Sequence, residues 1–413
     1  MVQNDGSVDA GAYDATIAGP GHAVVRTRSG RFIALYLTRT GAGIGANWSY
    51  SDNYSNGNWT NGGLVWSDGN VGVFPQLGID SGDSVHAAWT STSASRAVWY
   101  GYMSPTHLGW SGFISVISYA SACNAFLCLN TNNYITIVSS TGTKAAEASI
   151  DANVSSNNGV TWSGSSPLQN TAGPVQLCAD STGLVHCVYN RTDGAYLTIR
   201  YRNFNPSTLV WGAETEINPA TDAYDQTSPS ICVDWNDDIH ITWLGRWNVA
   251  PAFDSVRYIN KISGSWGAVQ NLSSEATAAA KFPCISIDYN AGTQNAYVSY
   301  AGYSVPDTAY RIWQTSAAGA AFNSWSAPAI VSTYSAIAMD ASASIYQRTP
   351  IWMVPKTGWG LTYDEVVGNF DPRCSMTATT AADWNEWQAL TFTVTGKMDL
   401  TGAKMIFIRS PGP

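Results

Sequence analysis

Three of the five histidines stand at matching positions along the chain, so metal coordination is the first chemistry to consider. Each follows an aspartate by six residues, and the pairs are Asp80/His86, Asp180/His186 and Asp234/His240. Imidazole is a common metal ligand. However, each pair belongs to a different copy of a repeat, and other copies carry Ile33, Thr136 or Tyr346 at the histidine position. The sequence therefore predicts a structural role for these histidines and no metal site.

The cysteines do not form a zinc motif either. Cys128, Cys178 and Cys232 occupy equivalent positions in consecutive repeats and lack the paired spacing of zinc ligands. Small buried thiols are ordinary core residues. The total of seven cysteines is odd, so at least one thiol is free. We expect buried, unpaired thiols and folding in a reducing compartment.

Aromatic side chains are the best candidates for ligand contacts, because their rings can stack on sugars. Those that fall in register with the repeat are expected in the core. The others lie in segments rich in Gly, Ser and Asn, which are typical of exposed loops that carry binding residues. The eight candidate ligand-binding residues are Trp48, Tyr50, Tyr54, Trp66, Trp99, Tyr102, Trp247 and Tyr303.

No catalytic residue is predicted. Neither a Gly-rich phosphate-binding loop nor a G-x-S-x-G turn occurs in a suitable context. Hydrolysis of a glycosidic bond needs two carboxyl groups roughly 5–10 Å apart, and sequence spacing cannot single out such a pair among 29 acidic residues. We expect a non-enzymatic protein without cofactors, with glycoside hydrolysis as an alternative.

A repeat of about 52 residues must position these side chains. An apolar strand that ends in an acidic or amide residue recurs at intervals of 50 to 54 residues, and its copies end at Asp80, Asn130, Asp180, Asp234, Asp288 and Asp340. A degraded copy near Ser29 and Gly30 brings the number to seven. The residue two places before the acidic one is always small, as Gly78 is, which is expected where neighbouring sheets crowd together.

Such a unit holds about four short strands and no helix, and it cannot bury its faces alone. We therefore predict an all-β, seven-bladed β-propeller with four-stranded antiparallel blades. Residues 21–383 would form the propeller. Residues 1–20 would be an N-terminal arm or closure segment, and residues 384–413 would add C-terminal strands for closure or partner contact.

The charge balance excludes several partners. Only 12% of residues are charged and the net charge is −9, whereas nucleic-acid binding needs a basic face. Residues 97–143 contain no Asp, Glu, Lys or Arg, but Ser, Asn and Gly interrupt them every few residues, so we expect no membrane insertion. Residues 1–21 have neither the basic nor the apolar region of a signal peptide.

The segment SSNNGVTW at residues 155–162 resembles the Asp-box of sialidase-like propellers, S-x-D-x-G-x-T-W. Ser155, Gly159, Thr161 and Trp162 match the pattern, and Asn157 stands where Asp is usual. In that family the box is a turn on the rim of the propeller, away from the active site. The resemblance therefore implies a propeller fold and a structural role for these five residues.

The family's catalytic residues are harder to find. Its site contains an arginine triad, a Tyr–Glu nucleophile pair and an acidic general acid, and the first arginine normally lies in an Arg-Ile-Pro motif. Tyr363 and Glu365 are the best neighbouring pair of these types. The first repeat has a cluster of arginines without that motif, namely Arg26, Arg28, Arg31 and Arg39.

The chain also resembles structural or tail-associated propellers of bacteriophages in its low charge, its Gly/Ser/Thr/Asn-rich loops and its lack of an export signal. We therefore expect a virion module, folded in the host cytoplasm, that binds neighbouring virion proteins or a cell-surface glycan. Association into a homo-oligomer stays open. The alternatives are a glycan-binding lectin propeller, exported without a signal peptide, and a sialidase-like glycoside hydrolase.

Overall fold

The description of the structure covers most of the chain between residues 24 and 363 and two short segments beyond it. In the computed structural model, the described residues are 24–27, 31–40, 43–52, 60–66, 76–91, 96–106, 109–119, 123–130, 132–141, 149–165, 167–169, 171–219, 222–247, 253–290, 293–306, 309–319, 322–330, 338–344, 347–354, 360–363, 374–375 and 393–394.

The first half of the described chain forms three antiparallel sheets. The first contains β1 (Val24–Arg26), β2 (Phe32–Thr40), β3 (Gly43–Ser51) and β4 (Thr60–Trp66). The second contains β5 (Gln76–Ile79), β6 (Val85–Ser91), β7 (Arg96–Met103) and β8 (Trp110–Tyr119). The third contains β9 (Cys123–Leu129), β10 (Ile135–Thr141), β11 (Ser149–Ser155), β12 (Ser163–Gly164) and β13 (Leu168–Gln169).

The same pattern continues in the second half. The fourth sheet contains β14 (Thr171–Ala179), β15 (Val185–Asp193), β16 (Tyr196–Asn205), β17 (Val210–Trp211) and β18 (Thr215–Glu216). The fifth contains β19 (Gln226–Val233), β20 (Ile239–Gly245), β21 (Ser255–Ile262), β22 (Ser265–Trp266) and β23 (Gln270–Asn271). The sixth contains β24 (Lys281–Asn290), β25 (Thr293–Ser304), β26 (Ala309–Ala318) and β27 (Ala329–Ile330).

Two smaller sheets follow. One contains β28 (Ala338–Ser344), β29 (Gln347–Val354) and β30 (Gly360–Tyr363), and the other pairs β31 (Cys374–Ser375) with β32 (Thr393–Val394). Within the described ranges the protein has strands and no helix. The prediction of an all-β chain built from antiparallel, four-stranded units is confirmed in the first six sheets, each of which has a run of four paired strands; the third, fourth and fifth add one short strand beside it. Residues 1–20 lie outside the described part, and only β32 is described within residues 384–413.

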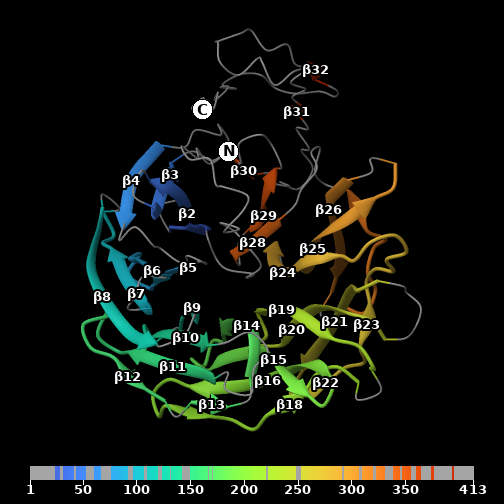
Figure 1. Cartoon of the computed structure of the whole chain (residues 1–413), viewed down its shortest axis with the longest axis horizontal. Helices are drawn as coiled ribbons and strands as arrows, with labels where there is room; N and C mark the ends of the chain where they lie inside the picture. The colour runs from blue at the N-terminus through green and yellow to red at the C-terminus, as the bar shows by residue number, and fades with distance from the viewer. Residues whose placement is uncertain are drawn as a thin grey trace.

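The sheets stand around a common centre in chain order (Figure 1). The first strand of each sheet contacts the first strand of the next, from β1 and β5 through β9, β14, β19 and β24 to β28. In addition, β1 contacts β28, so the sheets at the two ends of this series meet. Each sheet of this series thus has neighbours on both faces, which explains why inner strands such as β6 and β20 are buried along their whole length.

The turn between the first two strands of a sheet is built around the recurring acidic residue. Asp80 Oδ1 accepts hydrogen bonds from the backbone N–H groups of Gly82 and Ser84, both at 2.8 Å. Asp80 Oδ2 lies 3.2 Å from His86 Nε2, and His86 Nδ1 lies 2.7 Å from Tyr100 Oη. Both ring nitrogens of the histidine therefore face protein partners.

The same arrangement recurs in two other sheets. The Asp–His distance is 3.2 Å in the fourth sheet and 3.7 Å in the fifth, and the His–Tyr distances are 2.7 and 2.8 Å. The side chains involved are Asp180, His186 and Tyr201 in one and Asp234, His240 and Tyr258 in the other. Because each histidine is held inside its own sheet, the three do not meet.

Hydrogen bonds between turns also tie neighbouring sheets together. Ser181 donates its backbone N–H to Asp237 Oδ1 at 2.8 Å and its hydroxyl to Asp237 Oδ2 at 2.5 Å. Ser81 donates to Asn133 Oδ1 in the same two ways, at 3.2 and 2.7 Å. Asn133 and Asp237 both have positive φ, a conformation that Asn and Asp tolerate better than most residues.

The SSNNGVTW segment forms a compact turn after β11. Asn157 Oδ1 accepts the Thr161 N–H at 2.9 Å, and Ser155 Oγ accepts the Gly159 N–H at the same distance. Trp162 Nε1 donates to the Gly159 carbonyl at 3.1 Å. The turn packs against the preceding sheet, since Tyr100 and Trp162 meet edge to face with ring centroids 5.2 Å apart.

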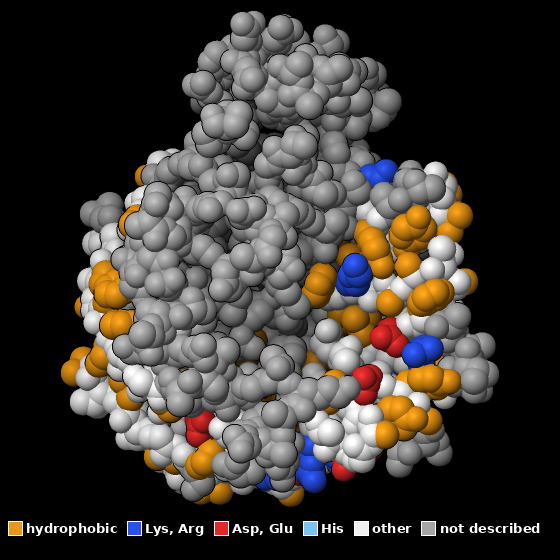
Figure 2. All heavy atoms as spheres, viewed as in Figure 1, with side chains coloured by type: hydrophobic (Ala, Val, Ile, Leu, Met, Phe, Trp, Pro, Cys, Tyr) orange, Lys and Arg blue, Asp and Glu red, His pale blue; other side chains and the backbone are white. Residues whose placement is uncertain are grey.

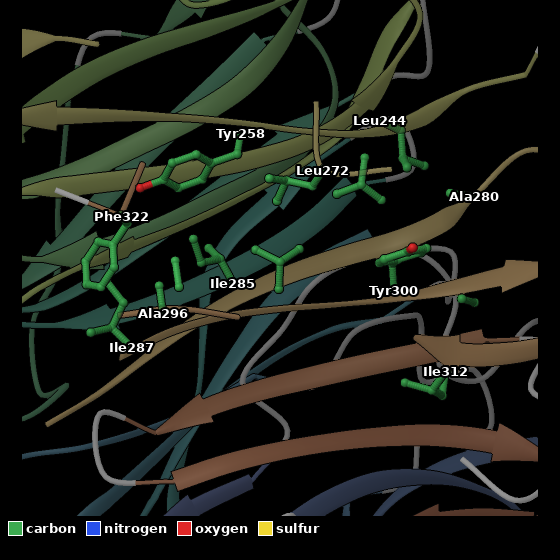
Figure 3. Packing of buried hydrophobic residues seen from close by; sticks show 14 residues of the cluster. Leu244, Tyr258, Leu272, Ala280, Ile285, Ile287, Ala296, Tyr300, Ile312 and Phe322 are labelled. Atoms are coloured by element: carbon green, nitrogen blue, oxygen red, sulfur yellow. The ribbon is translucent and has the colours of Figure 1, made fainter. Parts of the chain in front are cut away.

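The core lies between successive sheets. One cluster joins the fifth and sixth sheets, and Figure 3 shows its side chains, among them Leu272, Ile285 and Tyr300, between the facing ribbons. At the small repeat position, a Cβ added to Gly78 would stand 2.1 Å from Leu129 Cδ1 of the next sheet. A larger residue there would collide with the neighbouring sheet.

Candidate functional site

Most of the aromatic residues predicted as loop contacts lie in strands instead. Tyr54 is outside the described residues, and Trp247 alone of the eight lies in a described bend, after β20. The strand positions are Trp48 and Tyr50 in β3, Trp66 in β4, Trp99 and Tyr102 in β7, and Tyr303 in β25. The prediction of exposed loops is therefore wrong for these six residues.

Packing between rings explains their position. Trp48 is only 4% exposed, and a Cβ on Gly62 would stand 2.0 Å from its ring, so glycine lets the indole pack flat. Trp66 and Trp99 lie with ring centroids 4.8 Å apart. The glycine-rich sequence predicted loops. In the structure, glycines such as Gly62 lie in strands, where the missing side chain leaves room for an aromatic ring.

Trp247 and Tyr303 are brought together. They line a cavity of about 500 Å³ between the fifth and sixth sheets, together with Asn271, Glu275, Tyr300 and Trp313. Tyr300 and Tyr303 come from β25 and Trp313 from β26, whereas Asn271 ends β23 and Glu275 lies in the segment that follows it. The cavity has the mixture of aromatic walls and a few polar groups that is typical of ligand sites.

Glu275 is the one charged residue among those that line this cavity. Its backbone N–H donates to Ser255 Oγ at 3.0 Å, which anchors the segment to β21. Burial raises the pKa of Glu275 above its ordinary value, and a hydrogen bond with the Ser273 side chain offsets only part of this effect. The carboxyl charge in turn contributes to the raised pKa values of Tyr300 and Tyr310, after burial as the main cause.

A buried arginine supports the opposite wall. Arg257 is 2% exposed, forms an ion pair with Asp222, and donates through Nε to Asn271 Oδ1 at 3.2 Å. Its guanidinium carbon lies 5.8 Å from the ring centroid of Trp247, within cation–π range. Arg257 therefore contacts two residues of the cavity wall, one aromatic and one polar.

The third wall is held by contacts within the sixth sheet. Trp313 Nε1 donates to the Gly302 carbonyl at 3.1 Å, and a Cβ on Gly302 would stand 2.7 Å from Trp313 Cδ1. Tyr303 meets Tyr310 edge to face with centroids 5.6 Å apart. Lys281 Nζ lies 4.2 Å from the Tyr310 ring centroid. The aromatic rings are thus held in place before any ligand arrives.

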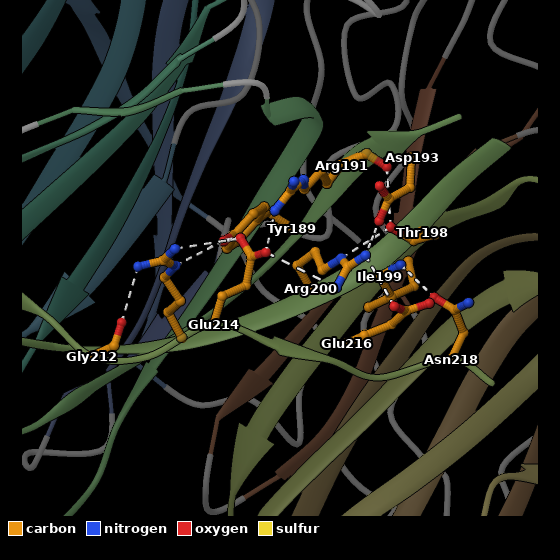
Figure 4. Close-up of polar contacts among 11 residues, drawn as sticks. Tyr189, Arg191, Asp193, Thr198, Ile199, Arg200, Gly212, Glu214, Glu216 and Asn218 are labelled. Carbon is orange, nitrogen blue, oxygen red and sulfur yellow. Dashed lines mark hydrogen bonds and ion pairs between the residues drawn. The ribbon is translucent and has the colours of Figure 1, made fainter. Parts of the chain in front are cut away.

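A Tyr–Glu pair surrounded by three arginines occurs elsewhere, in the fourth sheet (Figure 4). Tyr189 Oη donates to Glu214 Oε2 at 2.7 Å, and Arg191 and Arg202 pair with the same carboxylate. Burial would raise the pKa of Glu214, but the Tyr189 hydrogen bond and the arginine charges outweigh it and lower that pKa. Arg200 pairs with Asp193 and Glu216.

This cluster differs from a site that grips a substrate carboxylate. Three arginines face three protein carboxylates, and Tyr189 is fully buried. The charges are therefore balanced within the protein. Tyr363 lies at the end of β30 and Glu365 outside the described residues, as does Arg28, so the structure does not test the sequence-based pair.

On the face shown in Figure 2, the charged side chains of the described residues form no large patch of one sign. Figure 2 shows acidic and basic side chains in small mixed groups among hydrophobic and polar ones on the face that it presents. Among the described residues, no group of three or more His, Cys, Asp and Glu side chains is arranged to hold a metal ion. The part of the chain that the structure describes also has no helix that could span a membrane.

Three residues of the cavity were missed by sequence reasoning. Tyr300 and Trp313 belong to strands and had no motif around them, and Glu275 stands in the unremarkable segment SSEATAA. For Glu275, the rarity of its residue type could have served as a signal, because the chain has only six glutamates and few charged residues overall.

Comparison with known proteins shows which fold the chain has but does not assign it to a family. Neither the protein-family models nor the curated proteins match the sequence. Among solved structures, polysaccharide lyase Uly1 aligns with 87% of this chain and 94% of its own, at 11% identity and a TM-score of 0.57. A PL25 ulvan lyase bound to -[GlcA(1-4)Rha3S]- aligns with 88% and 96%, at 12% identity and 0.54.

A third neighbour is a protein of unknown function from Dyadobacter fermentans, which covers 76% of this chain and 97% of its own at 12% identity and a TM-score of 0.51. These neighbours are β-propellers. At such low identity the likeness shows the fold alone, and the chain therefore has a propeller-type arrangement of sheets.

Proposed function

We propose that this protein binds carbohydrate in the cavity between its fifth and sixth sheets. The observation that carries the proposal is the combination of Trp247, Tyr303 and Trp313 with the carboxyl group of Glu275 around a space of about 500 Å³. Aromatic faces stack on the apolar faces of sugar rings, and carboxyl and amide groups bond the hydroxyls at their edges. The likeness in fold to lyases that act on polysaccharides supports the same class of ligand.

The test is retardation of the protein in gels that contain a dissolved polysaccharide. Four polysaccharides serve as probes: arabinan, galactomannan, ulvan and polygalacturonate. We expect at least one to retard the protein, and Trp247→Ala or Tyr303→Ala to weaken the retardation about tenfold, as loss of a buried aromatic contact does. Trp235→Ala is the matched control, because Trp235 is 68% exposed in the turn between β19 and β20 and does not line the cavity. Equal retardation of all variants would refute the assignment of the cavity.

Cleavage of a glycan is the second candidate function. Glu275 favours it, since burial raises the pKa of its carboxyl group, as is typical of carboxyl groups that act as general acids. An assay for new reducing ends or unsaturated products on the same four polysaccharides separates the two candidates. Product formation that Glu275→Gln abolishes would show an enzyme, whereas binding without products supports a recognition module.

The finer features of the molecule are also proposals. We infer seven blades, the last of them built on β28–β30, because β28 contacts β1. A place in a virion, where the module would contact neighbouring proteins or a cell-surface glycan, is supported by composition alone. The chain at fixed stoichiometry in purified particles would support it, and its absence from them would refute it.

A further inference from the structure

The charges around the cavity are unusually one-sided. Glu275 is the single carboxylic acid among the described lining residues, and none of these is Lys, Arg or His. The remaining polar groups are neutral amides and hydroxyls, such as those of Asn271 and Ser273. The described part of the wall therefore offers no positive charge to a ligand.

Cations on the segments that carry the lining residues are engaged by protein groups, and Arg311, two residues before Trp313 in β26, also takes part in an interaction within the protein. Arg257 forms a buried ion pair with Asp222 and bonds Gln226 Oε1 at 2.9 Å, so its charge is compensated behind the wall. Lys281 lies over the face of Tyr310. Arg246, which precedes Trp247, pairs with Asp254 at 3.3 Å. A ligand carboxylate or sulfate would compete with Asp222 for Arg257 or with Asp254 for Arg246.

We propose that the cavity selects uncharged sugar residues and rejects uronates, sialates and sulfated sugars. This inference rests on the proposed carbohydrate-binding function and names its ligand class. An anion placed beside Glu275 would be desolvated without a compensating cation and would face a like charge. Rejection of the wrong ligand by repulsion is a common source of specificity.

A neutral sugar fits the same groups well. The Glu275 carboxylate can accept hydrogen bonds from two neighbouring hydroxyls, and Asn271 can both donate and accept. The rings of Trp247, Tyr303 and Trp313 supply apolar faces. The proposal separates this chain from the ulvan lyase of similar fold, whose bound oligosaccharide contains glucuronate and sulfated rhamnose. A shared fold does not fix the charge of a site.

The experiment measures the dissociation constants of the full chain for the four probes named above. Arabinan and galactomannan are neutral, whereas ulvan and polygalacturonate are acidic. The measurements are made at about 0.5 M salt, where the Debye length is short and repulsion by the net protein charge is screened. We expect the neutral probes to bind at least tenfold more tightly than the acidic ones.

Two variants assign the discrimination to Glu275. Glu275→Gln should reduce the ratio of the dissociation constants for acidic and neutral probes, here called the gap, about tenfold. Asp83→Asn removes the same charge in the turn between β5 and β6, at a positive φ that Asn tolerates, and should leave the gap unchanged. A gap that survives Glu275→Gln would overturn the role of Glu275.

Two other outcomes separate a failure of the proposed selectivity from a failure of the proposed function. If an acidic probe binds as tightly as the neutral ones and Trp247→Ala weakens it, the cavity binds carbohydrate but the proposed selectivity is wrong. If no probe binds, or if binding is insensitive to Trp247→Ala, the proposed function itself fails.

Discussion

At the scale of single residues, two carboxyl environments in this molecule have opposite effects on stability. Glu275 is held above its ordinary pKa by burial. Asp80, Asp180 and Asp234 are also partly buried, yet hydrogen bonds from turn groups and histidines outweigh that effect and lower their pKa values. The hydrogen-bonded carboxylates of Asp80, Asp180 and Asp234 therefore stabilise the fold. The ionised carboxylate of Glu275 does not, because its burial is only partly compensated.

Glu275→Gln should raise the melting temperature at neutral pH, by about 1–2 °C for a chain of this size. Because the pKa of Glu275 is higher in the folded protein, ionisation costs stability as the pH rises through that range. Below the ordinary value of 4.5 both states are protonated and the difference should vanish. Thermal unfolding of both proteins at pH 3.5 and 7.5 measures the effect, and stabilisation at both pH values would contradict it.

Asp180→Asn should destabilise the protein at neutral pH by about 1–3 kcal/mol, because His186 Nε2 would lose a carboxylate partner. The turn itself should survive, since Asn130 forms the equivalent turn in the third sheet. The folded pKa of Asp180 is lowered, so its contribution is present above 3.8 and is lost as the pH falls through the folded value. Urea unfolding at pH 7 and at pH 3 should show a difference that shrinks in acid; a constant difference would argue against this linkage.

At the scale of elements, turns and glycines set how closely neighbouring sheets approach. The SSNNGVTW turn packs on Tyr100 of the preceding sheet, and Tyr100 is itself bonded to His86. A Cβ on Gly159 would stand 2.1 Å from the Tyr100 ring, at a φ of +82°. Backbone conformation and close approach therefore both favour glycine at this position.

Gly159→Ala should destabilise the protein by about 2–4 kcal/mol, which combines backbone strain and overpacking. Gly194→Ala is the matched control, because Gly194 also has positive φ but no atom lies within 4 Å of its added Cβ. It should lose only about 1 kcal/mol. Chemical denaturation measures both variants, and equal losses would mean that the contact with Tyr100 contributes nothing.

At the scale of the whole molecule, the described sheets bury their inner strands on both faces. Cys128, Cys178, Cys187, Cys232 and Cys284 form no disulfide bonds, and all lie in the first or second strand of their sheets. Burial raises the pKa of the Cys128 thiol to about 12, and it raises those of Cys178, Cys187 and Cys232 as well. The reactivity of these thiols should therefore show whether the sheets remain packed against one another.

These five thiols should react with DTNB at least a hundredfold more slowly in the folded protein than in denaturant at pH 8, because thiolate is the reactive form and access is blocked. All five should become reactive in the same range of urea concentration, as expected if the packed sheets unfold cooperatively. Peptide mapping by mass spectrometry follows each cysteine separately. Fast labelling of Cys187 or Cys284 in native protein would contradict the burial of the inner strands.

Much of the architecture followed from residue types and their spacing. Period-two alternation, a small residue such as Gly78 at a fixed place and a recurring Asp before each turn predicted antiparallel sheets packed on both faces. These are local signals, because a strand and its turn are specified by residues close together in sequence. The same register placed the histidines beside their own turns.

The tertiary structure alone decided where the candidate site lies. The cavity takes Trp247 from the end of one sheet, Glu275 from a later segment of the same sheet, and Tyr303 and Trp313 from the next. No spacing rule links these positions, since the contact arises from two sheets packing face to face. The same packing buried Trp48, which the sequence placed in a loop. Repetition thus determined the sheets, whereas the site depends on how non-equivalent side chains meet between them.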